Sequence, residues 1–288
     1  MKGFIFSIIA ISFMLLLITL AITMSNEYWE TERVSAQPQP LSYAAATLET
    51  VGKLFCDVSL PDAGVSSDNS SLNIRVADSV PRSGNGGQLS ALKSYVEGDL
   101  ADSLHADISV NTSQVDNSSL RVALADSFAY ENGKNGTREV FFGTITNASS
   151  TGATRYSLNI SVNEFRRSVG AFTFIPGGDM NVTIRYTDKN GTVESSGKLN
   201  SNAPNTMTFD YGTNVSTGSL EVIIGRVDRG PDRYEGALWM NASNTTSVDF
   251  AFGAALPLQP SNRSSFIVLP LEMRYVQGGI TKTMNASR

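Results

Sequence analysis

The sequence is poor in the residues on which several classes of function depend. Its 288 residues include one cysteine, Cys56, and one histidine, His105. A single cysteine excludes an internal disulfide, and a single histidine excludes metal sites built from several imidazoles or from ordinary His–Cys sets. The fold is therefore expected to be stable through packing alone. Cys56 follows an apolar stretch, which favours a buried side chain over an intermolecular disulfide.

Positive charge is also scarce. The chain has 22 Lys and Arg against 27 Asp and Glu, which gives a net charge of -5, and charged residues make up only 17% of it. Without a basic run to neutralise phosphates, nucleic acid is not an expected partner. The surface polarity comes instead from Asn, Ser and Thr, which is not typical of a cytosolic enzyme.

Motifs for catalysis or metal binding are missing as well. His105 is the only base available to a Ser-His-Asp triad, and no nucleophile-elbow motif accompanies it. Two groups of carboxylates could supply oxygen ligands to Ca²⁺, namely Asp99, Asp102 and Asp107, and Asp228 and Asp232. Neither matches a calcium-loop pattern, so we interpret the first as the polar side of a helix and the second as a turn. We assign no catalytic residue, metal or cofactor, although a glycosidase pair of carboxylates needs no close spacing and stays an alternative.

One long uncharged apolar stretch is present, at residues 4–24. As a helix it would span roughly 31 Å, enough to cross a bilayer. Lys2 precedes it, whereas Glu27, Glu30 and Glu32 follow it, so the positive-inside rule predicts an inside N-terminus and an extracellular body. The alternative is a secretory signal cleaved near Ala36. That alternative is less favoured because the apolar stretch is longer than a usual signal and a polar segment separates it from the cleavage point.

The segment Lys2-Gly3-Phe4, followed at once by this hydrophobic stretch, resembles the processing site of type IV pilins. In that family a prepilin peptidase cuts after the Gly, and the apolar helix packs into the core of a filament. The resemblance covers about the first 24 residues. Ile8 stands where bacterial pilins carry a Glu five residues into the mature helix.

We predict a mainly β protein with four segments. Residues 1–34 form the transmembrane helix and its flank, and residues 35–56 form a Pro-rich stalk followed by a short helix. Residues 57–150 form a small α+β domain, because alternating apolar residues indicate strands near 72–76 and 120–124 and a helical period indicates a helix over 89–104.

Residues 151–288 are predicted to form an antiparallel β-sandwich-like domain. Strand patterns recur over 156–162, 171–175, 180–186, 207–211, 220–224, 248–252 and 266–275. Asn190-Gly191 between two of them is the strongest hairpin signal in the chain. Trp239, in a strand-like run, is assigned to sheet packing rather than to an exposed stacking platform.

Acceptor sequons for N-glycosylation are unusually frequent. They occur at Asn69, Asn111, Asn117, Asn135, Asn147, Asn159, Asn181, Asn190, Asn214, Asn241, Asn244, Asn262 and Asn285. Random placement of the Asn, Ser and Thr residues would give about four such motifs. Asn159 and Asn181 alternate with apolar neighbours along their strands, so their side chains should point to solvent. Dense sequons without a disulfide framework, together with the pilin-like start, resemble archaeal surface proteins.

These observations predict a membrane-anchored, N-glycosylated extracellular surface protein with a structural or interaction role, as a pilin-like filament subunit or a pilus-associated component. Its partners would be the lipid bilayer through residues 4–24, N-linked glycans, and copies of itself or other surface or pilus proteins. A second hypothesis is a monomeric anchored ectodomain that acts as an adhesin or binds a ligand. A third is an extracellular carboxylate-dependent hydrolase.

Overall fold

The computed structural model divides the chain into two compact units, Met1–Tyr43 and Ala44–Arg288. The structure describes residues 14, 18, 39–60, 62–68, 70–82, 86–113, 115, 120–124, 128–133, 137–144, 152–212, 217–243, 247–257, 267–277 and 280–287. Within this described part, no helix is long and apolar enough to cross a membrane. Apart from Met14 and Ile18, the stretch 4–24 lies outside the described residues.

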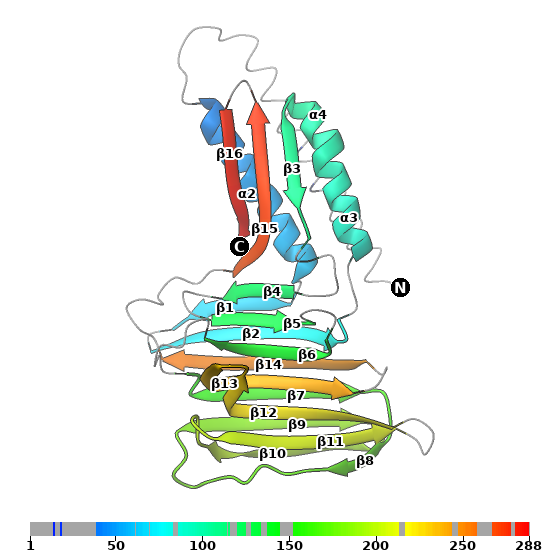
Figure 1. Ribbon diagram of the computed structural model, residues 1–288, viewed down its shortest axis with the longest axis vertical. Coiled ribbons are helices and arrows are strands. Elements are labelled where there is room, and N and C mark those ends of the chain that lie inside the picture. Colours follow the sequence, from blue (N-terminus) through cyan, green and yellow to red (C-terminus); the bar gives the residue numbers. More distant parts are fainter. Residues whose placement is uncertain are drawn as a thin grey trace. The chain divides into compact units, whose positions relative to one another are not determined.

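The second unit is mainly β, as predicted, and its strands pair in two sheets (Figure 1). Sheet A has the order β1 (Ala63–Ser67), β2 (Ser71–Val80), β14 (Val248–Pro257), β7 (Arg155–Val162), β9 (Met180–Asp188) and β10 (Gly191–Leu199). Its pairs are antiparallel except for β7 and β9, which run parallel. The predicted β9–β10 hairpin is confirmed, although its turn is shifted by one residue from Asn190-Gly191: the two turn residues are Lys189 and Asn190, and Gly191 begins β10 opposite Asp188.

Sheet B contains the remaining described strands and is antiparallel. Its order is β16 (Ile280–Ser287), β15 (Ile267–Gln277), β4 (Leu120–Leu124), β5 (Phe128–Asn132), β6 (Glu139–Thr144), β13 (Asp232–Ser243), β12 (Thr217–Arg229), β11 (Pro204–Gly212) and β8 (Arg166–Val169). The short strand β3 (Asp107–Asn111) pairs with β15. Strands from both sides of residue 150 thus share each sheet, since β2 pairs with β14 and β6 pairs with β13.

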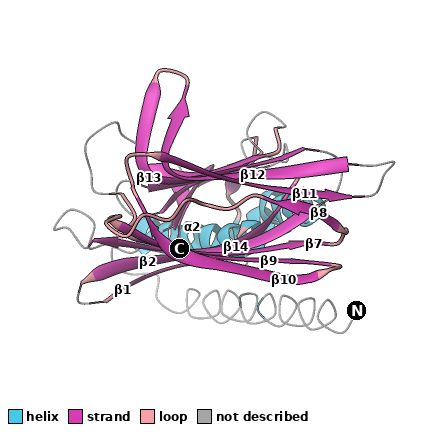
Figure 2. Cartoon of the chain, turned by 90° about the horizontal axis from the view of Figure 1, so that it is seen from below, coloured by secondary structure: helices cyan, strands magenta, loops and turns pink. Residues whose placement is uncertain are grey.

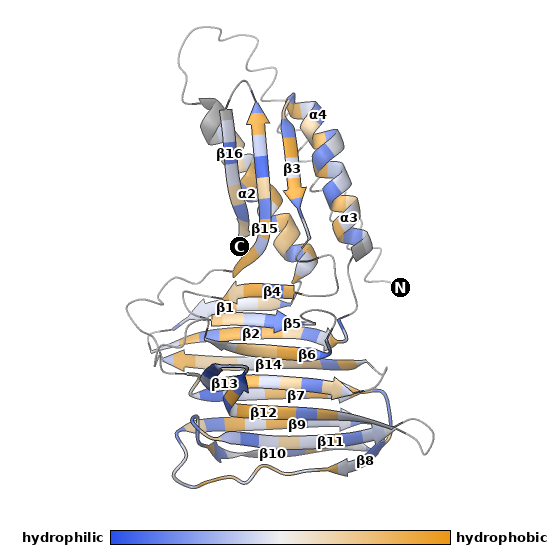
Figure 3. Cartoon of the chain, in the orientation of Figure 1, coloured by the Kyte–Doolittle hydropathy of each residue, from blue (hydrophilic) through white to orange (hydrophobic). Residues whose placement is uncertain are grey.

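The two sheets face each other as layers over part of their area (Figure 2). Aromatic rings from the two sheets meet between them. The Tyr186 ring of sheet A stacks on the Phe209 ring of sheet B, with 4.3 Å between the ring centroids. The ring centroids of Phe142 in sheet B and Phe252 in sheet A are 5.1 Å apart. Along β15, buried residues alternate with half-buried or exposed ones. Figure 3 shows hydrophobic and hydrophilic residues alternating along part of the same strand. Burial of this apolar face supplies the main driving force for the fold.

A helix and a three-stranded extension of sheet B pack at one end of this unit. Helix α2 (Gln39–Ser59) begins with Pro40 in its first turn, where the missing N–H of proline costs no hydrogen bond. The helix predicted within residues 35–56 is confirmed, but it is longer than expected and extends to Ser59. Gly52 lets α2 approach closely, because a Cβ there would lie 3.1 Å from Met273 of β15. Cys56 is 1% exposed, as expected for a structural side chain.

The predicted helix over 89–104 is confirmed as a continuous helical segment. It consists of α3 (Gly86–Tyr95), a π-helical turn at Val96–Leu100 and α4 (Ala101–Leu104). Glu97 in the π-helical turn accepts a hydrogen bond from the Val110 N–H of β3 at 2.7 Å. This hydrogen bond links the helical segment 86–104 to β3.

Candidate functional site

The pilin-like processing residues Lys2, Gly3 and Phe4 lie outside the described residues. The same holds for seven of the sequon asparagines, Asn69, Asn117, Asn135, Asn147, Asn214, Asn244 and Asn262. The structure therefore bears on the other six, Asn111, Asn159, Asn181, Asn190, Asn241 and Asn285. All of these are exposed except Asn241, which is half-buried.

The outward orientation predicted for Asn159 and Asn181 is confirmed. Asn159 is exposed on β7 between Leu158 and Ile160, which are 0% and 2% exposed. Asn181 is exposed on the adjacent strand β9. Both asparagines therefore belong to the side of sheet A that points away from sheet B.

The sequon at Asn190 lies in the β9–β10 turn. Its backbone N–H donates to Asp188 Oδ1 at 2.8 Å, and its side-chain Oδ1 accepts from the Arg166 N–H at 3.2 Å. The amide nitrogen, which is the atom that carries a glycan, makes neither of these two bonds. The turn thus holds the side chain in place while leaving its reactive end available.

The outer face of sheet A, which points away from sheet B, is formed by small and polar residues. It includes Asn73, Arg75, Arg155, Ser157, Asn159, Asn181, Arg185, Ala251, Gly253 and Ala255. Gly253 of the central strand β14 lies opposite Arg75 of β2 and Ser157 of β7. On this face, residues 251–255 of β14 therefore present only Ala251, Gly253 and Ala255 between the longer side chains of β2 and β7.

Two adjoining hollows follow this row of small residues. The first has a volume of about 530 Å³ and is lined by residues that include Arg75, Arg155, Asn159 and Gly253. The second, of about 440 Å³, is lined by residues that include Asn159, Arg185 and Asp249. Because Asn159 and Ala251 line both, we call the two hollows together the sheet A groove. Both hollows are shallow and open along one side.

The charge along the sheet A groove is mostly positive. Arg75, Arg155 and Arg185 are exposed, and none of the ion pairs recorded among the described residues involves them. Asp249 is the single carboxylate in the groove lining. In a chain with net charge -5, this face is suited to a neutral or anionic polar ligand.

The outer face of sheet B differs, because an aromatic cluster covers it. Trp239 lies opposite Phe141 and Ile223 in the ladder and is half-buried, in agreement with the predicted packing role. The Phe141 ring contacts Tyr234 edge-on at 4.9 Å, and the Arg229 guanidinium lies 4.5 Å above it. The loop interpreted as a turn is thus a β12–β13 hairpin that folds onto this face.

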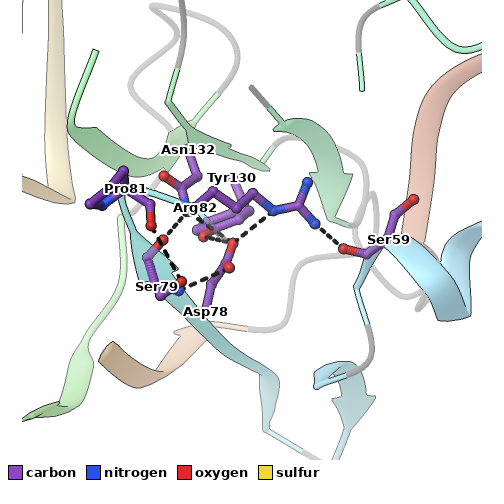
Figure 4. A network of polar contacts seen from close by, with 7 residues as sticks. All are labelled: Ser59, Asp78, Ser79, Pro81, Arg82, Tyr130 and Asn132. Atoms are coloured by element: carbon purple, nitrogen blue, oxygen red, sulfur yellow. Dashed lines mark hydrogen bonds and ion pairs between the residues drawn. The ribbon is translucent and has the colours of Figure 1, made fainter. Parts of the chain in front are cut away.

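Between the sheets, a buried polar network joins β2, β5 and the end of α2 (Figure 4). Asp78 Oδ2 accepts hydrogen bonds from Tyr130 Oη at 2.8 Å and from Asn132 Nδ2 at 2.9 Å, and it lies 3.4 Å from Arg82 Nε. Arg82 in turn donates to the Ser59 carbonyl. We call this set the Asp78 junction.

The Asp78 junction is shielded from solvent. The Arg82 side chain is 5% exposed and that of Asp78 is 13% exposed. Burial, followed by the neighbouring Asp78 carboxylate, raises the pKa of the Tyr130 phenol well above its usual range. The phenol therefore stays a hydrogen-bond donor, and the cluster acts as a structural link between the sheets rather than as an acid–base site.

The other candidate residues are not brought together. His105 ends α4 in a left-handed conformation with φ 49° and is exposed. Arg226 pairs with Asp228 at 3.2 Å. Within the described ranges, no three His, Cys, Asp or Glu side chains are grouped so as to hold a metal ion.

No family model matches the chain, and neither a curated protein nor a solved structure shows a match to it.

Proposed function

We propose that the chain is a membrane-anchored, N-glycosylated surface protein with a structural or interaction role, whose β-rich body is a sandwich-like ectodomain. Residues 4–24 serve as the anchor, and cleavage after Gly3 would make the chain a pilin-like subunit or a pilus-associated component. The pilin-like form rests on the resemblance of Lys2-Gly3-Phe4 and the adjoining apolar stretch.

The placement of the sequons is the observation that carries the proposal. Five of the six described sequon asparagines are exposed, although they occur within or beside strands rich in buried apolar residues. A glycan at these positions would stand in solvent without disturbing the core. On Asn285 of the edge strand β16 it would also hinder edge-to-edge pairing between molecules. The excess of sequons over random placement supports the same interpretation.

The proposal is tested on the native protein purified from the membrane fraction of its own cells. Glycopeptide mass spectrometry should find glycans on Asn159, Asn181 and other exposed sequons, and extraction should require detergent. A soluble protein without glycans on any sequon would contradict the proposal.

N-terminal sequencing of the same material separates the forms of the anchor. Phe4 as the first residue supports prepilin-type processing, and filaments containing the protein in sheared surface material support a subunit role. An intact Met1 or Lys2 supports the alternative of a monomeric anchored adhesin or ligand-binding ectodomain, which the open sheet A groove favours. A start after Ala36 would show that the apolar stretch is a signal peptide.

The hydrolase hypothesis has a separate requirement. A carboxylate-dependent glycosidase needs two facing carboxyl groups about 5–10 Å apart. The sheet A groove presents one, Asp249. We therefore rank this hypothesis below the two binding or structural roles.

A further inference from the structure

The sequon Asn159 differs from the other described sequons because it lies inside a groove. Its side chain lines both hollows of the sheet A groove. In the ladder it lies opposite Ala251 on one side and Arg185 on the other. A glycan attached to Asn159 would therefore begin where the two hollows meet.

We propose that the glycan on Asn159 folds back along β14 and is held in the sheet A groove as an acidic saccharide. This inference rests on the glycosylation proposed above and names a role for one of its sites. The bound glycan would cover the outer face of sheet A, just as the β12–β13 hairpin covers the outer face of sheet B.

The groove floor leaves room for sugar rings. Ala251, Gly253 and Ala255 follow one another along the outer side of β14, so the backbone there is nearly bare. A Cβ placed at Gly253 would meet no atom closer than the Ile74 carbonyl oxygen at 4.0 Å. Glycine within a strand is typical of sites where a ligand or another backbone approaches closely.

The groove walls supply polar and cationic groups. Arg75 and Arg155 flank the floor, and Asn73 and Ser157 add hydrogen-bonding groups between them. Asn159 and Arg155 lie on the same side of β7 and are separated by roughly 13 Å, at about 3.3 Å per residue. A chain of a few sugars could therefore reach Arg155, where a guanidinium binds a carboxylate or sulfate in a bidentate manner.

Asn181 provides a matched control. It is exposed on the same face of sheet A and lies opposite Arg155 in the β7–β9 ladder. It does not, however, line either hollow. Because Asn181 lies directly opposite Arg155, the arginine tested with it is Arg75, which lies opposite Gly253 on β14. A glycan on Asn181 shares the sheet face but not the groove, so it should not depend on Arg75.

The experiment is a double-mutant cycle on the full-length protein, expressed in its own cells, purified in detergent and monitored by thermal unfolding. We expect Asn159→Gln and the double variant Arg75→Gln/Arg155→Gln each to lower the Tm by about 3 °C. Combined, they should lower it no further than either change alone, because both remove the same contact. The effects of Asn181→Gln and of Arg75→Gln alone should instead add, whereas those of Asn159→Gln and Arg75→Gln should not.

A second variant blocks the groove without removing charge. Gly253→Val places a β-branched side chain on the open floor, which a strand accommodates well. It should lower the Tm by about as much as Asn159→Gln in the glycosylated protein. In the Asn159→Gln background, Gly253→Val should leave the Tm unchanged or raise it.

The outcomes separate this inference from the proposed function. Glycans at other sequons with none at Asn159 would overturn the inference and leave the proposed function standing. So would a glycan at Asn159 whose removal is additive with loss of the arginines. Binding of free oligogalacturonate by the protein that carries the Asn159 glycan, with loss of that binding in the arginine variant, would show an open receptor groove and overturn the fold-back. A protein without any glycan would contradict both.

Discussion

The outer faces of the two sheets differ in composition and in what covers them. On sheet B, the β12–β13 hairpin covers Phe141, which is 3% exposed beneath Tyr234 and Arg229. On sheet A, the corresponding surface has a floor of Ala251 and Gly253 and is open to solvent. One face carries aromatic rings with a cover from the same chain, and the other carries arginines and sequons without such a cover among the described residues.

This difference shows that the two outer faces contribute unequally to the stability of the fold. An exposed aromatic patch would favour association, so sheet B buries its rings under its own hairpin and adds a small second core. Sheet A needs no apolar cover because its outer side chains are small or polar. Its outer face therefore buries little apolar surface and contributes little to folding.

The largest expected effect comes from the Asp78 junction, which supports both faces by joining β2 of sheet A to β5 of sheet B. Asp78→Ala leaves Arg82 buried without its carboxylate partner and should lower the free energy of unfolding by about 3–5 kcal/mol. Denaturant unfolding followed by tryptophan fluorescence measures this change. Asp249→Ala, at an exposed carboxylate on sheet A, should stay within about 0.5 kcal/mol. Equal losses for the two variants would contradict a junction role.

The next effect tests the cover on sheet B. Phe141→Ala removes a buried ring together with its contacts to Tyr234 and Arg229, and should cost about 3 kcal/mol. The same unfolding assay measures it, with Phe165→Ala as the control because Phe165 is 52% exposed. A small loss for Phe141→Ala would mean that the hairpin does not stabilise the fold.

A pair of glycine substitutions compares the two faces directly. On sheet B, a Cβ at Gly143 would lie 2.6 Å from Phe141 Cζ and 3.1 Å from Ala237 Cβ, so Gly143→Val should cost about 1–3 kcal/mol through overpacking. On sheet A, Gly253→Val in the Asn159→Gln background should cost nothing, because its floor is open. Similar losses at both positions would show that the sheet A face is closed in solution.

Most local features of this fold could be predicted from the sequence, whereas its long-range features could not. One local prediction was wrong, because the strand expected at 171–175 is a loop between β8 and β9. The alternation around Asn181 identified both a strand and its exposed side, since side-chain direction in a strand depends on neighbouring residues alone. The β9–β10 hairpin was predicted for the same reason, from two turn residues. The pairing of β2 with β14 depends on tertiary contacts between segments far apart in the chain, and no local pattern encodes it.

The residues of the candidate site also divide into those predictable from local sequence and those that depend on tertiary contacts. The exposed sequons could be read from the sequence, but the sheet A groove arises only where β2, β14 and β7 are placed side by side. Its one local signal was Gly253 between small residues within a strand. The Asp78 junction was equally hidden, because Tyr130 and Asn132 reach Asp78 from another sheet.

The smallest effect concerns the turn that begins β2 at the edge of sheet A. Asp68 Oδ1 accepts from the Ser70 and Ser71 N–H groups at 2.8 and 2.7 Å, and these bonds hold the pKa of the carboxyl well below its usual range. The carboxylate therefore stabilises the turn fully above the ordinary pKa of about 3.9, and the contribution declines as the pH falls below it. Following the Ser71 amide by NMR should show a midpoint below pH 3.9, absent in Asp68→Asn. A midpoint at or above 3.9 would show that these bonds do not persist in solution.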